Sequence, residues 1–219
     1  MRLLLAGATG LVGGHVLEQA LADHRVTRLV APTRRPLPPH EKLLNPIVTA
    51  ADLPLDENWW AVDSAISALG TTRAKAGSAD AFRAIDHDYP LAVARQVKAR
   101  GARCFVLTSA MGANARSAFF YNRVKGDLEL ALSKLDFASL TLARPGLLVG
   151  KRAEHRFAEN MAAVLAGVLD PVLPTALPNP ASAVAALLLE AAIRSEPGTH
   201  IITAADIVRA AARSRTGKD

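Results

Sequence analysis

The sequence predicts an α/β fold in which a parallel sheet carries helices on both faces. Strand-like apolar runs alternate with helical patterns along most of the 219 residues, and this alternation is typical of sheets built from strand-helix-strand units. Half of the residues are hydrophobic and 21% are charged, so the chain can bury a sizeable core. A first strand at residues 2–6 runs into glycines and then into a helical pattern over 11–23, which is how a doubly wound sheet begins.

The remaining elements are expected in the same alternating order. The predicted strands are 26–31, 47–50, 62–69, 103–108 and 139–144. The predicted helices are a short segment at 53–60, a long helix at 79–99 that Pro90 kinks or divides, and a helix at 121–132.

The pattern changes after Gly150. Apolar helices are expected at 157–169 and 181–194, separated by a proline-rich stretch. We therefore predict a first domain at 1–150 and a small C-terminal helical lobe at 151–219, beside the carboxyl edge of the sheet and continuous with the same fold.

Three glycines spaced three apart follow the first strand, at Gly7, Gly10 and Gly13. Glycine suits a tight exit from the strand, a bare backbone where a pyrophosphate approaches, and close packing of the next helix. The N–H groups at the start of that helix stabilise a phosphate without any basic side chain. The pattern predicts a Rossmann-type nucleotide-binding domain; the alternative is a glycine-rich turn without a ligand.

Two arginines follow the second predicted strand, in Thr33-Arg34-Arg35. In dinucleotide-binding folds an acidic residue at this place binds the ribose 2′-hydroxyl, whereas arginine accommodates a 2′-phosphate. The guanidinium groups would bind that phosphate with charge-assisted hydrogen bonds. Arg34 and Arg35 therefore predict NADP(H); the alternative is that both are solvated loop residues.

A second group of residues has the chemistry of a proton-transfer site. Ser109 follows the fifth strand, and Tyr121 and Lys125, four apart, share one face of the next helix. A nearby ammonium and the positive nicotinamide favour the phenolate, so we expect a lowered pKa for Tyr121. Tyr121 would then exchange a proton with a substrate oxygen that Ser109 also binds. Such tyrosine-lysine pairs also arise by chance on solvated helices, and it is the order of the motifs that favours catalysis.

In that order, the motifs resemble the short-chain dehydrogenases/reductases of the atypical or extended sort, over residues 1 to about 156. Three segments are more narrowly similar to the Tat-interacting oxidoreductase-like NAD(P)-binding proteins and their bacterial relatives: 69–77 (LGTTRAKAG), 86–89 (DHDY) and 124–129 (VKGDLE). The resemblance implies that Tyr121 is the acid/base. It also places Asp86 where many of these enzymes have an asparagine that completes a proton relay.

The resemblance further implies which residues bind the cofactor. NADP(H) would be held by Thr9, Gly10, Leu11, Val12, Arg34, Arg35, Leu69, Gly70, Tyr121, Lys125, Leu148 and Arg156. Asp52 and Leu53 would flank the adenine, and Gly7, Gly13 and Thr71 complete the candidate set.

Three functions stay open at this point. The first is an NADPH-dependent reductase of a small carbonyl compound, with Tyr121 as proton donor. The second is a nucleotide-binding regulatory or scaffold protein with little or no turnover, favoured by the short region after Gly150. The third, a nucleotide-sugar epimerase or dehydratase, is disfavoured because such sites need a larger second lobe. The family fold does not decide among them.

The composition limits the cellular compartment and the binding partners that we expect for the protein. A single cysteine, Cys104, excludes a disulfide within the chain and favours a cytoplasmic protein. We expect no membrane span, because no apolar stretch approaches the roughly 18 residues it needs. The histidines lack metal-ligand spacing, so no metal is predicted. The net charge of +6 is scattered, so nucleic-acid binding is not expected, whereas a homodimer through exposed helices is conceivable.

Overall fold

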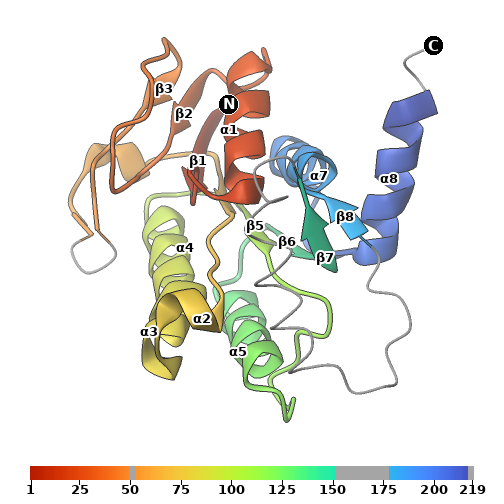
Figure 1. Ribbon diagram of the computed structural model, residues 1–219. Helices are drawn as coiled ribbons and strands as arrows, with labels where there is room; N and C mark the ends of the chain where they lie inside the picture. Colours follow the sequence, from red (N-terminus) through yellow and green to blue (C-terminus); the bar gives the residue numbers. More distant parts are fainter. Residues whose placement is uncertain (50–52, 151–177, 217–219) are drawn as a thin grey trace.

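The computed structural model describes residues 1–49, 53–150 and 178–216, and in these ranges a seven-stranded parallel sheet has helices on both faces (Figure 1). The strand order is β3-β2-β1-β4-β5-β6-β9. The strands are β1 (Arg2–Ala6), β2 (Arg28–Val30), β3 (Leu43–Leu44), β4 (Ser64–Ser67), β5 (Cys104–Thr108), β6 (Ser139–Arg144) and β9 (Gly198–Thr203). The chain winds outward from β1 in both directions, which confirms the predicted doubly wound architecture.

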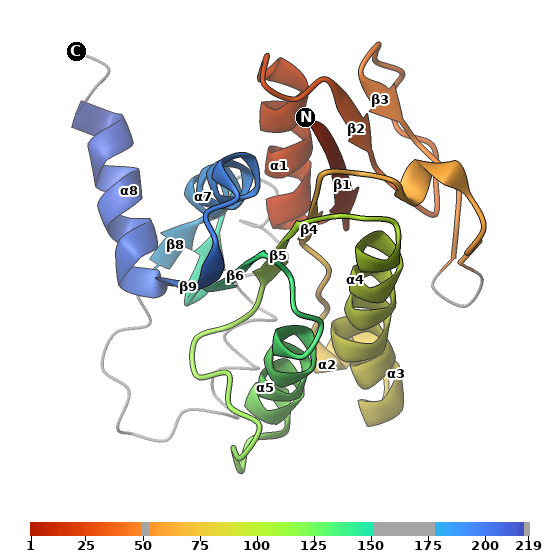
Figure 2. The ribbon, with the colours of Figure 1, turned by 180° about the vertical axis from the view of Figure 1, so that it is seen from behind.

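Two pairs of helices cover the sheet. One face carries α1 (Leu11–Ala22) and α7 (Ala181–Arg194), and the other carries α4 (Tyr89–Ala99) and α5 (Phe120–Ser133) (Figure 2). The side chains of β1 alternate between these layers: Leu3 and Leu5 pack with α1 and α7, and Leu4 packs with α4 and α5. All three are fully buried. Each contributes about 1.5–3 kcal/mol of burial free energy, so β1 anchors both layers.

The third strand lies at a different place from the one predicted. The prediction at 47–50 is wrong, because β3 is formed by Leu43 and Leu44, which pair with β2. Ile47 makes only an isolated bridge to Thr33 and is 56% exposed. A strand of two residues is too short to show an alternating pattern, so the apolar residues after it attracted the prediction.

The long helix predicted at 79–99 is divided. It consists of α3 (Ala79–Arg83), the π-helical turn η2 (Ala84–Asp88) and α4. Pro90 lies in the first turn of α4, where its missing N–H leaves no hydrogen bond unmade, so the division falls just before it. Within η2, Asp86 and His87 are buried.

The other predicted strands and helices lie close to their expected ends, except that the segment at 53–60 shrinks to the 3-10 turn η1 (Asn58–Trp60). Elements that were not predicted are α2 (Arg73–Ala76), β7 (Leu147–Val149), β8 (Pro178–Pro180), β9 and α8 (Ala204–Thr216). Strands β7 and β8 pair in parallel as a separate two-stranded sheet. None of the described helices is long and apolar enough to cross a bilayer.

The C-terminal part shares the layers of the main sheet. Strand β9 extends it beside β6, α7 packs on α1, and α8 stands beside α7 (Figure 2). Asn179 is fully buried, accepting from Gly146 N at 2.7 Å and donating to Ala204 O at 3.0 Å. The helix predicted at 157–169 lies outside the described residues, and the domain boundary at residue 150 stays a prediction.

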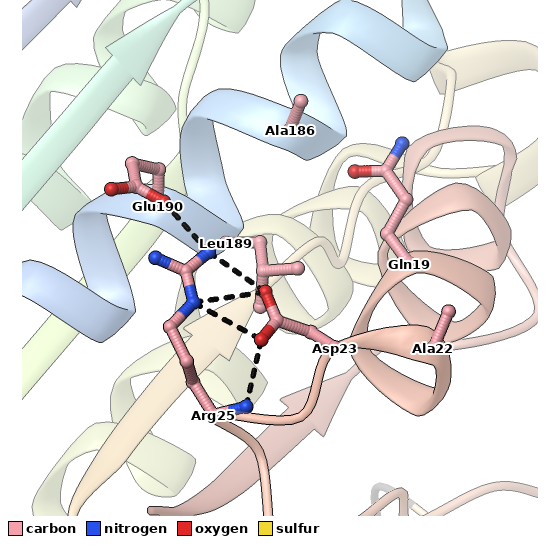
Figure 3. Close-up of a pocket in the computed structure, with 7 residues that line it drawn as sticks. All are labelled: Gln19, Ala22, Asp23, Arg25, Ala186, Leu189 and Glu190. Carbon is pink, nitrogen blue, oxygen red and sulfur yellow. Dashed lines mark hydrogen bonds and ion pairs between the residues drawn. The ribbon is translucent and has the colours of Figure 1, made fainter.

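An ion-pair network joins α1 to α7 at the amino edge of the sheet, around an open hollow of about 390 Å³ (Figure 3). Arg25 donates to Asp23 Oδ2 at 2.7 Å and to Glu190 Oε2 at 3.0 Å. The side-chain hydrogen bonds from Arg25, opposed by burial, hold the pKa of Asp23 at about 2. Gln19 donates to the carbonyl of Ser182 at 3.1 Å, so each polar side chain that lines the hollow has a hydrogen-bond partner.

We predict that Asp23→Asn lowers the melting temperature at neutral pH by about 3 °C or less, because exposed pairs contribute about 1 kcal/mol at most. A carboxylate with a depressed pKa stabilises the folded state above its ordinary value of 3.8, and this stabilisation is lost as the pH falls toward 2. The difference between wild type and variant should therefore shrink below about pH 4 in a calorimetric pH series. Asp56→Asn, in an exposed loop, is the control; a difference that persists at pH 2 contradicts the assignment.

Candidate active site

The turn after β1 has the geometry for which its glycines were singled out. Gly7 has a φ of +91°, and a Cβ there would lie 2.8 Å from the backbone carbonyl carbon of Ala68. A Cβ at Gly13 would lie 2.0 Å from the carbonyl oxygen of Gly7. Gly10 is less crowded and donates its N–H to Gly7 O at 2.9 Å. Gly7 thus serves the tight turn, and Gly13 allows α1 to approach it.

The start of α1 is suited to an anion. Gly10 is the N-cap, and among the described residues no side chain caps the helix there. The first backbone N–H groups of a helix lack partners within it and carry partial positive charge. No acidic side chain lies in the first turn. The bare glycine turn and this uncapped helix start, which contain the predicted Thr9, Leu11 and Val12, fit the phosphates of a dinucleotide.

The carboxyl ends of the central strands bring the other candidate residues to the same edge. Leu69 and Gly70 follow β4, next to the turn after β1. A Cβ at Gly70 would lie 3.6 Å from Asp86 Oδ1 and 3.9 Å from Lys125 Nζ, so this glycine faces the second group of residues. The switch in winding direction falls between β1 and β4, which is where open α/β sheets bind ligands.

The loop after β2 presents both arginines to solvent. Thr33 Oγ donates to the carbonyl of Arg35 at 2.7 Å, and Asn45 Nδ2 donates to Thr33 Oγ at 2.8 Å. Arg34 and Arg35 are exposed, and neither forms an ion pair with a described residue. Asn45 was not predicted; it shapes the loop from the neighbouring β3 connection.

Tyr121 and Lys125 lie one turn apart on α5, and Asp86 joins them from η2. Lys125 Nζ lies 2.7 Å from Asp86 Oδ1, with Lys125 3% exposed and Asp86 fully buried. The other oxygen of Asp86 accepts from the backbone N–H of Thr71 at 2.8 Å. The ring of Tyr121 lies 5.7 Å from that of Phe82 and keeps one side in solvent.

The pKa of Tyr121 is raised, whereas the sequence led us to expect a lowered one. Desolvation by the surrounding protein raises its pKa; Lys125 pulls it down, but Asp86 pushes it up. Burial disfavours the Lys125 ammonium, yet the charges of Asp86 and Tyr121 raise the pKa of Lys125 above its ordinary value. Lys125 therefore stays charged beside a phenol. The expected lowering of the pKa is wrong chiefly because burial disfavours the phenolate, and in addition because the ammonium already has a carboxylate partner.

Ser109 lies directly after β5, and its hydroxyl already has a partner. It donates to Glu129 Oε1 at 2.5 Å, and Arg144 Nε donates to the same oxygen at 3.0 Å. Ser109 and Glu129 are both buried. The predicted contact of Ser109 with a substrate oxygen stays a prediction, whereas Glu129 was missed. The available signal was a carboxylate one turn after Lys125, on the apolar face of α5.

The remaining predicted cofactor residues divide into two groups. Leu53 and Leu148 are partly buried, Leu148 within β7. Asp52 and Arg156 lie outside the described residues. Among the described residues no cluster of histidine, cysteine, aspartate or glutamate could hold a metal ion.

The fold resembles solved nucleotide-binding structures. MoeE5 in complex with UDP-glucose and NAD matches with a TM-score of 0.70 and 16% identity, over 93% of this chain and 75% of that chain. The PhqB reductase domain from Penicillium fellutanum matches with a TM-score of 0.65 and 18% identity, over 94% and 67%. No protein-family model matches the chain. At these identities the likeness concerns the fold alone, which is of the Rossmann type.

Proteins with a similar amino-acid sequence identify the family of the chain. The protein fmp52, mitochondrial, of Emericella nidulans is 37% identical over 182 residues, covering 77% of this chain and 76% of the relative. The protein FMP52, mitochondrial, of Eremothecium gossypii is 38% identical over 171 residues, with coverages of 77% and 76%. The chain belongs to the FMP52 family. Its narrower likeness to the Tat-interacting oxidoreductase-like proteins stays a prediction.

These relatives contradict the predicted cytoplasmic location, because they are described as mitochondrial. The prediction rested on Cys104, which is buried in β5, where burial raises the pKa of its thiol. A single buried thiol excludes a disulfide within the chain but does not identify a compartment.

We predict that Gly13→Ala destabilises the protein by about 3 kcal/mol or more, because its Cβ would overlap the carbonyl oxygen of Gly7 and the backbone must shift. Glu18→Ala, on the exposed side of the same helix, should change the free energy of unfolding by about 0.5 kcal/mol or less. Urea unfolding measures both. Equal stability of the two variants contradicts the close contact.

Proposed function

We propose that the chain is an NADP(H)-dependent oxidoreductase that reduces a small carbonyl compound. The observation that carries this proposal is the placement of Tyr121 and a charged, buried Lys125 at the same sheet edge as the bare glycine turn. The description of the relatives also leads us to infer a mitochondrial setting.

The residues divide the work of the reaction. When bound, the reduced dinucleotide supplies a hydride to the carbonyl carbon. Tyr121 donates the proton of its hydroxyl to the carbonyl oxygen, which completes the alcohol and leaves a phenolate. Lys125 stabilises that phenolate by its charge. Because Tyr121 is 39% exposed, the phenolate regains its proton from water.

The preference for NADP(H) rests on the loop after β2. Arg34 and Arg35 are exposed there without an ion-pair partner among the described residues, so both guanidinium groups are available to a 2′-phosphate.

A second candidate function is nucleotide binding with little or no turnover. The observation that favours it is that the hydroxyl of Ser109 already donates its hydrogen bond to Glu129, so this hydrogen is not available to a substrate oxygen. A panel of carbonyl compounds separates the two, with loss of NADPH absorbance as the readout. Turnover of one compound supports the reductase; tight NADPH binding without turnover across the panel favours the second candidate.

We predict that Tyr121→Phe lowers turnover by about 10²- to 10⁴-fold, because the variant lacks the hydroxyl that is proposed to donate the proton. NADPH affinity should stay close to that of wild type. Tyr89→Phe is the matched control, since Tyr89 is the only other tyrosine of the chain, and it should keep its activity. Steady-state kinetics and calorimetric titration measure the two effects; unchanged turnover in Tyr121→Phe rules out the proposed proton donor.

We predict that Arg34→Ala combined with Arg35→Ala weakens NADPH binding about 10- to 100-fold, because hydrogen bonds to a charged phosphate contribute about 1.5–3 kcal/mol. NADH binding should change little. Arg28→Ala, an exposed arginine at the other end of β2, is the control. Dissociation constants for both nucleotides decide the matter, and a double variant that retains its NADPH preference refutes the role of the two arginines.

A further inference from the structure

The buried carboxylate of Asp86 connects three elements that are separate in the sequence. Its Oδ1 lies 2.7 Å from Lys125 Nζ of α5, and its Oδ2 accepts from Thr71 N, after β4, at 2.8 Å. Asp86 itself belongs to η2. Removing both charges from water costs free energy that only close contact and further hydrogen bonds offset.

The backbone around Asp86 differs from an ordinary helix in a way that concerns this carboxylate. Five residues of η2 form a π turn between two α-helical segments. Such turns occur frequently at functional sites, because they rotate side chains relative to a regular helix. Gly70 leaves the side of the pair toward the turn after β4 without a side chain. The ion pair therefore borders the candidate cofactor site directly.

We propose that Asp86 is a positioning residue that keeps Tyr121 protonated by holding the Lys125 ammonium in this buried ion pair. An ammonium without a partner, one turn from a tyrosine, favours the phenolate. Besides the burial of the phenol, which raises its pKa most, the carboxylate of Asp86 opposes the effect of the ammonium and adds its own repulsion of a second negative charge. Asp86 thus acts on the proton donor through Lys125.

Within the part of the chain that the structure describes, two charged groups act on Tyr121. Lys125 on its own helix and Asp86 on η2 act on it, and Lys125 is acted on in turn by Asp86, Tyr121 and Glu129. Glu129 is bound by Arg144 and Ser109, so its charge already has partners. The element packed against the ring, α3, contributes the apolar Phe82. Of these groups, Asp86 is the one whose charge opposes the Lys125 ammonium by direct contact.

The protonated state of Tyr121 matters for the reaction, and this step rests on the proposed function. A protonated phenol is the form that donates a proton to a carbonyl oxygen, which is the step that the proposed reduction requires. The Asp86-Lys125 pair therefore favours the protonation state in which the proposed reduction begins.

The test titrates Tyr121 without cofactor or substrate. In a Tyr89→Phe background Tyr121 is the sole tyrosine, and the ultraviolet absorbance of tyrosinate reports its ionisation alone. The reference protein should show no midpoint below pH 10, whereas adding Asp86→Asn should move the midpoint down by about one pH unit or more. Asp88→Asn, which removes a more exposed carboxylate of the same π turn, should behave like the reference.

A double variant distinguishes charge from loosened structure. Combining Asp86→Asn with Lys125→Met removes the whole pair, so the midpoint should return above pH 10; a merely opened site would leave it where Asp86→Asn put it. Circular dichroism checks folding, and Asp86→Ser replaces Asp86→Asn if the latter does not fold. A midpoint below pH 10 in the reference, or none in a folded Asp86 variant, overturns the proposal. Missing turnover with an intact titration overturns only the proposed reductase.

Discussion

The contact between the start of α1 and the turn after β1 is the constraint on which the carboxyl edge of the sheet depends. Gly13 can lie against the carbonyl of Gly7 only because Gly13 has no side chain. Gly7 in turn rests on the backbone of Ala68, so the turns after β1 and β4 are placed together. The chain then continues to Thr71, whose N–H is held by Asp86. A series of short contacts thus links β1 to the inner side of α5.

Two buried carboxylates make the inner side of α5 polar. Asp86 binds Lys125 and the backbone of Thr71, and Glu129 binds Ser109 and Arg144. Unpartnered, either carboxylate would cost several kcal/mol, and each is paired with a cation: Asp86 with Lys125, and Glu129 with Arg144. The result is a polar interior in which the protonation of every member depends on its neighbours, as in coupled titrations.

The sequence predicted the structure correctly where a hydrophobic pattern extends over many residues or where the backbone geometry requires glycine. The bounds of β1, β6 and α7 agree with the prediction, and the glycine turn has the expected form. Elements with a weak pattern were missed: β3 has two residues, and β9 is a largely exposed edge strand. The site was harder, because local spacing pairs Tyr121 with Lys125 but does not reveal a partner from another helix. Local spacing also does not reveal the burial that raises the pKa of Tyr121, so this pKa was expected to move the wrong way, and Glu129 was overlooked.

The π turn at η2 makes the orientation of Asp86 depend on chain length. A π turn accommodates one more residue than the same stretch of regular helix, and each residue of an α-helix turns the chain by about 100°. Deleting one residue between Ala84 and Asp88 would restore a continuous helix while swinging the residues before it around the axis. Such a one-residue deletion, even if it removed none of the site residues, would then separate the carboxylate of Asp86 from the ammonium of Lys125.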